Sequence, residues 1–212
     1  MKRVLLITPF SDLVHESFYG NVKELLAGLD AAVSAAFGFA GARRGPLGES
    51  PPEDDMAAGP LPEPLPARAF NGRRRQYAAT GLLAALAHKS KGLQRPGSHV
   101  AILGVTGADL FAPRLNFVFG MAEEAAATAV ISFHRLIPEF YREAPDPDLF
   151  KERAAKEAIH EMGHVFGLSH CTSPGCIMRF SSTIADTDDK GPDFCGRCAV
   201  RLAQTLGSEK KL

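Results

Sequence analysis

Residues 160–170 decide the fold and the chemistry of this chain, and they read HEMGHVFGLSH. Residues four apart on a helix share one face, so His160 and His164 can present their imidazoles to one metal ion. Glu161 then points beside the metal, which suits a base that holds a water molecule rather than a ligand. After the helix, the chain can reverse and deliver His170 as a third ligand. Three nitrogen ligands and one open position are typical of catalytic zinc, which these ligand types favour over other divalent metals.

The four cysteines of the chain come directly after this motif, as Cys171, Cys176, Cys195 and Cys198. Two close pairs of thiolates suit a closed tetrahedral zinc site with a structural role. A redox use of the final C-x-x-C is the alternative, although a thioredoxin-like context would not need the first pair. Because Cys171 adjoins His170, we expect the two metal sites to lie about 10–15 Å apart.

The helix that carries the histidines has recognisable ends in the sequence. Asp146 can cap its N-terminus, with Pro147 in the first turn. Helical spacing continues to about Phe166, and Gly167 permits the left-handed backbone turn that ends the helix.

Upstream of this helix, strands and helices alternate. Buried strands are predicted at residues 3–8, 99–106 and 128–133, a weaker β-like stretch at 31–40, and a short edge strand at 115–120. Helices are predicted at residues 21–30 and from the arginines at 73–75 through residue 88, although arginines at a helix start oppose the helix dipole. An anionic partner or a solvated helix face would account for them. The prolines of residues 41–72 predict a long surface loop, and the alternation as a whole predicts an α/β fold.

Composition excludes several classes of protein. The 212 residues suit one domain, and 24 basic against 24 acidic residues give no net charge, so neither nucleic acid nor an anionic membrane is the expected partner. No apolar run approaches the roughly 20 residues of a membrane helix. The start of the chain mimics a signal peptide, but Pro9 interrupts it and no cleavage site follows, so we expect a buried strand. Cysteines confined to one cluster favour a cytoplasmic protein. The sequence does not reveal the oligomeric state, for which a monomer is our expectation.

The histidine motif resembles that of the metzincins, in which a methionine-containing turn lies beneath the metal. With the cysteine spacing and Met178, two residues after Cys176, the chain is identified as a member of the archaemetzincin family of zinc metallopeptidases. The resemblance implies a metzincin-like zincin fold (α+β), with a twisted mixed sheet, a backing helix, an active-site helix and a small zinc-held C-terminal subdomain. It also implies that Met178 packs under the site without coordinating, and that a peptide pairs with the edge strand. Phe180 departs from metzincins that place a tyrosine at this position.

These observations predict a single catalytic metalloprotease domain over residues 1–212. Residues 1–166 would form the N-terminal subdomain with the active-site helix, and residues 167–212 a C-terminal subdomain with the Met-turn and the four-cysteine zinc site. The predicted activity is hydrolysis of peptide bonds in a peptide or protein by a zinc-bound water, with Glu161 as general base and two zinc ions per chain. The alternative is a non-catalytic, zinc-stabilised protein that binds peptides or proteins. A nucleic-acid-binding zinc ribbon is disfavoured, because residues 171–198 hold three basic residues against four aspartates.

Overall fold

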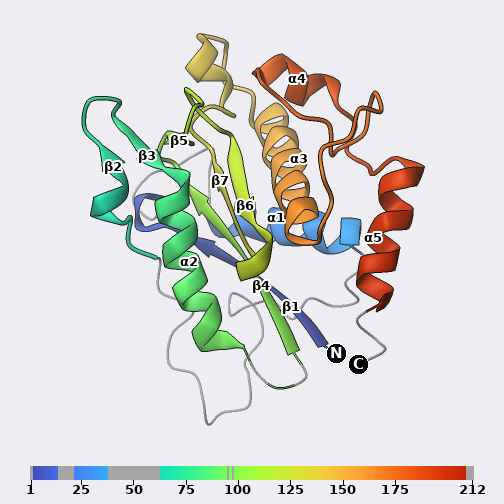
Figure 1. Ribbon diagram of the computed structural model, residues 1–212. Coiled ribbons are helices and arrows are strands. Elements are labelled where there is room, and N and C mark those ends of the chain that lie inside the picture. The colour runs from blue at the N-terminus through green and yellow to red at the C-terminus, as the bar shows by residue number, and fades with distance from the viewer. Residues whose placement is uncertain (1, 14–21, 38–62, 95, 97, 209–212) are drawn as a thin grey trace.

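The structure, a computed structural model, describes residues 2–13, 22–37, 63–94, 96 and 98–208. These residues form two sheets, the larger with the strand order β1-β4-β7-β6 and the smaller with the order β2-β3-β5 (Figure 1). The larger sheet contains β1 (Lys2–Pro9), β4 (Ser98–Thr106), β6 (Gly120–Glu123) and β7 (Thr128–Ser132). The smaller contains β2 (Phe70–Asn71), β3 (Gln76–Ala78) and β5 (Leu110–Phe111). Strands β1, β4 and β7 run parallel, whereas β6 is antiparallel to β7 and forms an edge of the larger sheet.

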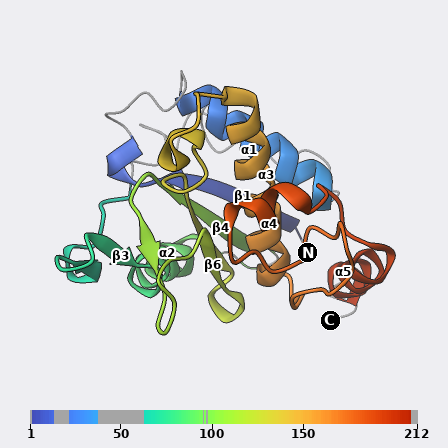
Figure 2. The same cartoon turned by 90° about the horizontal axis from the view of Figure 1, so that it is seen from above.

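Helices cover both faces of the larger sheet. The α-helices are α1 (Val22–Phe37), α2 (Ala79–Leu93), α3 (Pro147–Val165), α4 (Ile184–Asp189) and α5 (Gly196–Ser208). Short 3₁₀ helices occur at Ser11–Leu13, Ala67–Ala69, Glu124–Ala126 and Pro138–Tyr141. A hydrophobic core lies on each face of the larger sheet, and alternate side chains of β4 point into one core or the other. Leu103 and Val105 pack with α1 and α3, whereas Val100 and Ile102 pack with α2. Helix α5 lies on the far side of α3 from α2 (Figures 1 and 2).

The mixed α/β fold class is confirmed, and strands are found where residues 3–8, 99–106 and 128–133 predict them, the last ending at Ser132. The predicted cap of the active-site helix is also confirmed, because an Asp146 carboxylate oxygen accepts the backbone N–H groups of Asp148 and Leu149 at 3.1 and 3.0 Å. Residues 41–62 of the proline-rich stretch lie outside the described residues, as do residues 38–40 of the β-like stretch.

Three predicted elements are wrong. Residues 31–37 continue helix α1, because alanines that suit a weak strand suit a helix better. The edge strand is Gly120–Glu123, whereas residues 115–119 form a loop joined to β5 by one bridge, between Leu110 and Val118. The arginines at 73–75 do not begin a helix, since they lie in the turn between β2 and β3.

Charged side chains of α3 hold the C-terminal part of the chain against it. The buried Arg153 guanidinium donates to both oxygens of Asp188 at 2.7 Å. Lys156 donates to the Asp188 carbonyl at 3.0 Å, and Lys190 pairs with Glu157. The residues after the active-site helix are therefore tied to that helix. Among the described residues, no helix combines the length and apolar character that crossing a bilayer requires.

Candidate active site and metal centres

The structure brings the three histidines of the motif together. His160 and His164 lie one turn apart on α3, and their Nε2 atoms are 3.1 Å apart. The ring of His170 lies 4.7 Å from that of His164, between centroids. One ring nitrogen from each histidine falls within a cluster whose members are all within 4.8 Å of one another. This spacing allows all three imidazoles to reach one ion.

Two of these imidazoles are oriented by backbone carbonyl groups. The Nδ1 atom of His160 lies 2.8 Å from the carbonyl oxygen of Ile177, and that of His164 lies 2.6 Å from the carbonyl oxygen of Leu168. Because a carbonyl only accepts, each Nδ1 carries the proton and each Nε2 presents a lone pair. Two lone pairs facing each other at 3.1 Å need a cation between them. Burial also lowers the pKa of all three imidazoles, that of His160 most strongly, which favours the neutral form that binds metals.

The turn after α3 explains how the third histidine reaches the others. Gly167 has a φ of +80°, a conformation that a side chain would strain. Its N–H donates to the His164 carbonyl at 3.0 Å, and the N–H of Leu168 donates to the Gly163 carbonyl at 3.0 Å, so the chain reverses direction within one turn. His170 emerges exposed to solvent from this reversal, with the ring of Phe180 4.9 Å away.

Met178 lies directly beneath the active-site helix. Its side chain is fully buried, and a Cβ at Gly163 would collide with the Met178 sulfur unless that side chain shifted. The ring of Phe180, two residues further on, lies 4.9 Å from that of His170 and carries no oxygen.

Glu161 is buried beside the histidines, where it packs against Gly120 at the start of edge strand β6. Burial, followed by the neighbouring Glu157 carboxylate, raises the pKa of the Glu161 carboxyl well above its usual range. Glu157 itself pairs with the fully buried Lys190, with 3.1 Å between Oε2 and Nζ. A raised pKa makes this carboxylate a stronger proton acceptor than a solvent-exposed one.

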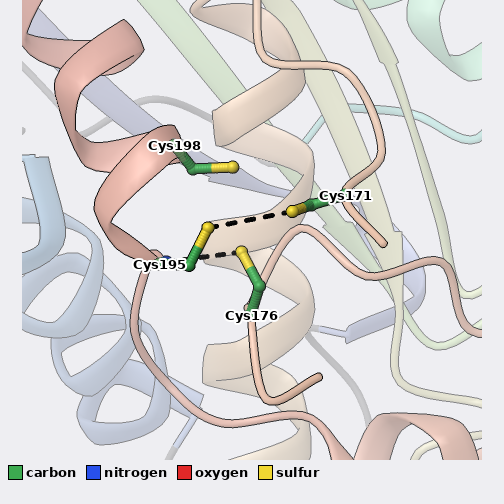
Figure 3. Close-up of side chains that lie close together, drawn as sticks. All are labelled: Cys171, Cys176, Cys195 and Cys198. Atoms are coloured by element: carbon green, nitrogen blue, oxygen red, sulfur yellow. Dashed lines mark hydrogen bonds between the residues drawn. The ribbon is translucent and has the colours of Figure 1, made fainter. Parts of the chain in front are cut away.

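The four cysteine sulfurs form a second cluster, also within 4.8 Å of one another (Figure 3). The Sγ atoms of Cys171 and Cys195 are 3.8 Å apart, which is far too long for a disulfide. Four sulfurs around zinc at about 2.3 Å would be separated by about 3.8 Å in a tetrahedron. A hydrogen bond from the backbone N–H of Cys198 lowers the pKa of Cys195 to about 6, whereas burial raises the pKa of Cys176 and of Cys198. A bound cation would favour the thiolate form of all four cysteines, and the spacing of the sulfurs fits zinc.

The C-x-x-C pair does stand at the start of a helix, because α5 begins at Gly196. This is the position in which a redox motif is usual. The first cysteine pair nevertheless completes the cluster around it, as metal binding requires and a dithiol does not.

A cleft of about 480 Å³ opens above the histidines. It is lined by residues 112 and 115–119, by the start of β6, by α3 and by Phe180 with the two serines that follow it. The lining is mostly apolar, and its acidic groups are the carboxyls of Glu157 and Glu161. Tyr141, whose hydroxyl donates to the Arg135 carbonyl at 2.9 Å, does not line this cleft.

Sequence reasoning missed two buried residues near the histidines. Glu157 precedes His160 by three positions and so shares its helix face, a signal that was available. Lys190 lies 33 residues further along the chain, and no local pattern marks it as buried.

Comparison with known proteins shows which class of enzyme the chain belongs to. Residues 66–204 match the model of peptidase family M54, so the chain is a zinc metallopeptidase. An archaemetzincin from Pyrococcus furiosus is 47% identical over 149 residues, which make up 70% of this chain and 76% of that protein. An archaemetzincin from Methanopyrus kandleri is 44% identical over 142 residues, 67% of this chain and 74% of that protein. The chain belongs to this family, the archaemetzincins, as the motif resemblance predicted.

Solved structures agree. The crystal structure of the Methanopyrus kandleri archaemetzincin matches with a TM-score of 0.71 at 32% identity, covering 97% of this chain and 96% of that one. The crystal structure of a zinc-dependent peptidase from Methanocorpusculum labreanum matches with a TM-score of 0.72 at 28% identity, covering 93% of this chain and 99% of that one. The metzincin-like fold expected from the sequence is therefore confirmed.

Proposed function

We propose that this zinc peptidase works through zinc held by His160, His164 and His170, with Glu161 as the general base. The observation that carries the proposal is the pair of Nε2 lone pairs that face each other at 3.1 Å, each fixed by a carbonyl at Nδ1. A buried carboxyl lies beside them at the floor of a cleft, where a peptide could be cut. Membership of the archaemetzincins supports the same chemistry.

Zinc at this position would polarise the scissile carbonyl and lower the pKa of water. The role of Glu161 is to take a proton from the attacking water and to return it to the leaving amine. Burial raises the pKa of Glu161, which makes its carboxylate a stronger proton acceptor for the attacking water. Edge strand β6 would hold the substrate through its backbone groups.

We further propose that Cys171, Cys176, Cys195 and Cys198 hold a second, structural zinc. Residues 167–212 would then form the C-terminal subdomain of a single catalytic domain, with residues 1–166 as its N-terminal part. The buried contacts between α3 and the segment around Asp188 support this organisation. Clustered thiols that bind metal are usual in a reducing compartment, so we place the chain in the cytoplasm. We keep a monomer as the expected oligomeric state.

The test is a mass-spectrometric survey of a diverse peptide library incubated with the zinc-loaded protein and with its Glu161→Gln variant. The matched control is Glu152→Gln, which makes the same change on the exposed side of the same helix. We expect cuts by the parent protein and by the control, and a loss of at least about 1,000-fold in the Glu161 variant. Both variants should keep the zinc content of the parent.

Equal cleavage by the parent and the Glu161 variant would show that another group is the base. If the zinc-loaded parent cuts nothing but still binds library peptides, the non-catalytic binding protein becomes the better description.

A further inference from the structure

A loop of eight residues, 112–119, forms a large part of the cleft wall, and we call it the rim segment. Apart from the single bridge between Leu110 and Val118, it does not belong to a sheet. The carbonyl groups of Ala112 and Phe119 accept backbone N–H groups, whereas those of Leu115 and Asn116 accept hydrogen bonds from side chains. Leu115 is 44% exposed at the cleft, so the segment presents apolar surface there.

Two side chains from the β2–β3 hairpin supply these hydrogen bonds. The Nη2 atom of Arg74 donates to the carbonyl oxygens of Leu115 and Asn116, at 3.0 and 2.8 Å. The Nε2 atom of Gln76 donates to the same Asn116 carbonyl at 3.0 Å. Two neighbouring carbonyl groups of the rim segment are thus held by groups some 40 residues earlier in the chain.

A second layer of contacts fixes these donors. The Nε atom of Arg74 donates to Oε1 of Gln76 at 2.9 Å, and Gln76 donates to an Asp109 carboxylate oxygen at 2.9 Å. Arg135 donates to both oxygens of Asp109 at 2.7 Å, and its guanidinium carbon lies 4.3 Å from the centre of the Phe117 ring. The network therefore starts and ends on the rim segment. Arg74, one of three consecutive arginines, thus has its hydrogen-bond partners within the chain, so an anionic ligand is not needed to explain it.

We propose that Arg74 and Gln76 are positioning residues for the substrate, because they fix the rim segment in the orientation in which it meets a bound peptide. Neither side chain is among those that line the cleft, so they act through the segment they hold. The inference rests on the proposed function, since the rim segment matters only if a peptide enters this cleft.

The experiment compares Arg74→Ala and Arg74→Lys with a control, Arg73→Ala, which removes the adjacent exposed arginine. Two probes are titrated into each zinc-loaded protein by calorimetry: a peptide hydroxamate with leucine side chains, and acetohydroxamate, which has a metal-binding group but no side chain. Hydrogen exchange of residues 112–119 is followed in the same samples by mass spectrometry. Neither measurement requires turnover.

Arg74→Ala removes the hydrogen bonds to the carbonyl groups of Leu115 and Asn116. We expect about tenfold weaker binding of the peptide hydroxamate, at the lower end of what charged hydrogen bonds contribute, with acetohydroxamate binding unchanged. Exchange at residues 112–119 should be about tenfold faster, as in a locally opened segment. Arg74→Lys should fall between parent and alanine variant, and Arg73→Ala should match the parent. Once a cleaved peptide is known, its KM should rise while its kcat stays within about twofold.

The inference is overturned if exchange and peptide binding are unchanged in Arg74→Ala. It is also overturned if the two hydroxamates weaken equally, because the arginine would then support the whole site rather than the peptide-binding wall. Failure of the parent to bind acetohydroxamate would instead contradict the proposed metal site, and the exchange data would still decide the role of Arg74.

Discussion

The buried ion pair between Lys190 and Glu157 allows a quantitative prediction about stability. The Lys190 side chain is fully buried and that of Glu157 is 5% exposed, with 3.1 Å between the charged atoms. We consider Lys190→Met, which keeps most of the volume of the side chain and removes its charge. The carboxylate of Glu157 would then be buried without a cation.

The magnitude follows from the geometry. At 3.1 Å and an effective permittivity of about 20, Coulomb's law gives an attraction of about 5 kcal/mol. Breaking a buried pair by removing one partner costs about 3–5 kcal/mol, whereas replacing both partners with apolar residues is close to neutral. We therefore expect Lys190→Met to lower the free energy of unfolding by about 3–5 kcal/mol, and Glu157→Leu in the same chain to restore most of that loss.

The assay is urea unfolding at a fixed free zinc concentration, because bound metal adds to the apparent stability. The matched control is Lys151→Met, the same substitution in an ion pair on α3 whose side chains are 58% and 95% exposed. The control should change the free energy of unfolding by less than about 1 kcal/mol. If Lys190→Met costs no more than the control, or if adding Glu157→Leu destabilises the chain further, the pair is solvated and the reasoning fails.

Three further predictions follow from other contacts. Gly163→Ala should lower the free energy of unfolding by about 1–3 kcal/mol, because the added methyl group overpacks against the Met178 sulfur, even though alanine favours helices. An unchanged melting temperature would mean that Met178 moves aside. Burial raises the pKa of Tyr141 above its ordinary value of about 10, so this phenol stabilises the fold below that pH, and the contribution is lost as the pH rises through the folded-state pKa. In a titration of absorbance at 295 nm, Tyr141→Phe should therefore remove the tyrosine that ionises late, and persistence of the late step would assign it to another residue. Cys198→Ala should reduce the zinc content, measured by mass spectrometry, from two ions per chain to one, which a redox role for the cysteine cluster would not produce.

Local patterns account for most of what the sequence predicted correctly. The histidines at 160 and 164 meet because a helix repeats every 3.6 residues, and the cap at Asp146 acts over three residues. The identity of the strands follows from continuous apolar runs, because strands covered on both faces have no polar side.

The errors concern contacts that no local pattern encodes. The three arginines were interpreted from their place before an alanine-rich segment, whereas the hairpin that holds them exists only because β3 pairs with β2 and β5. The partners of Arg74 lie 41 and 42 residues away, and the partner of Glu157 lies 33 residues away. Placing these groups requires the assembled fold.

The third histidine stands directly before the first cysteine, and this adjacency sets an order of events during synthesis. A ribosome releases the chain from its N-terminus, so His160 and His164 emerge well before the final cysteine pair. The N–H of Cys171 donates to the carbonyl of Met178 at 2.9 Å, so the loop that delivers His170 takes its shape together with the cysteine cluster. If His160, His164 and His170 hold the catalytic zinc as proposed, that centre would stay incomplete until the cysteine cluster has formed.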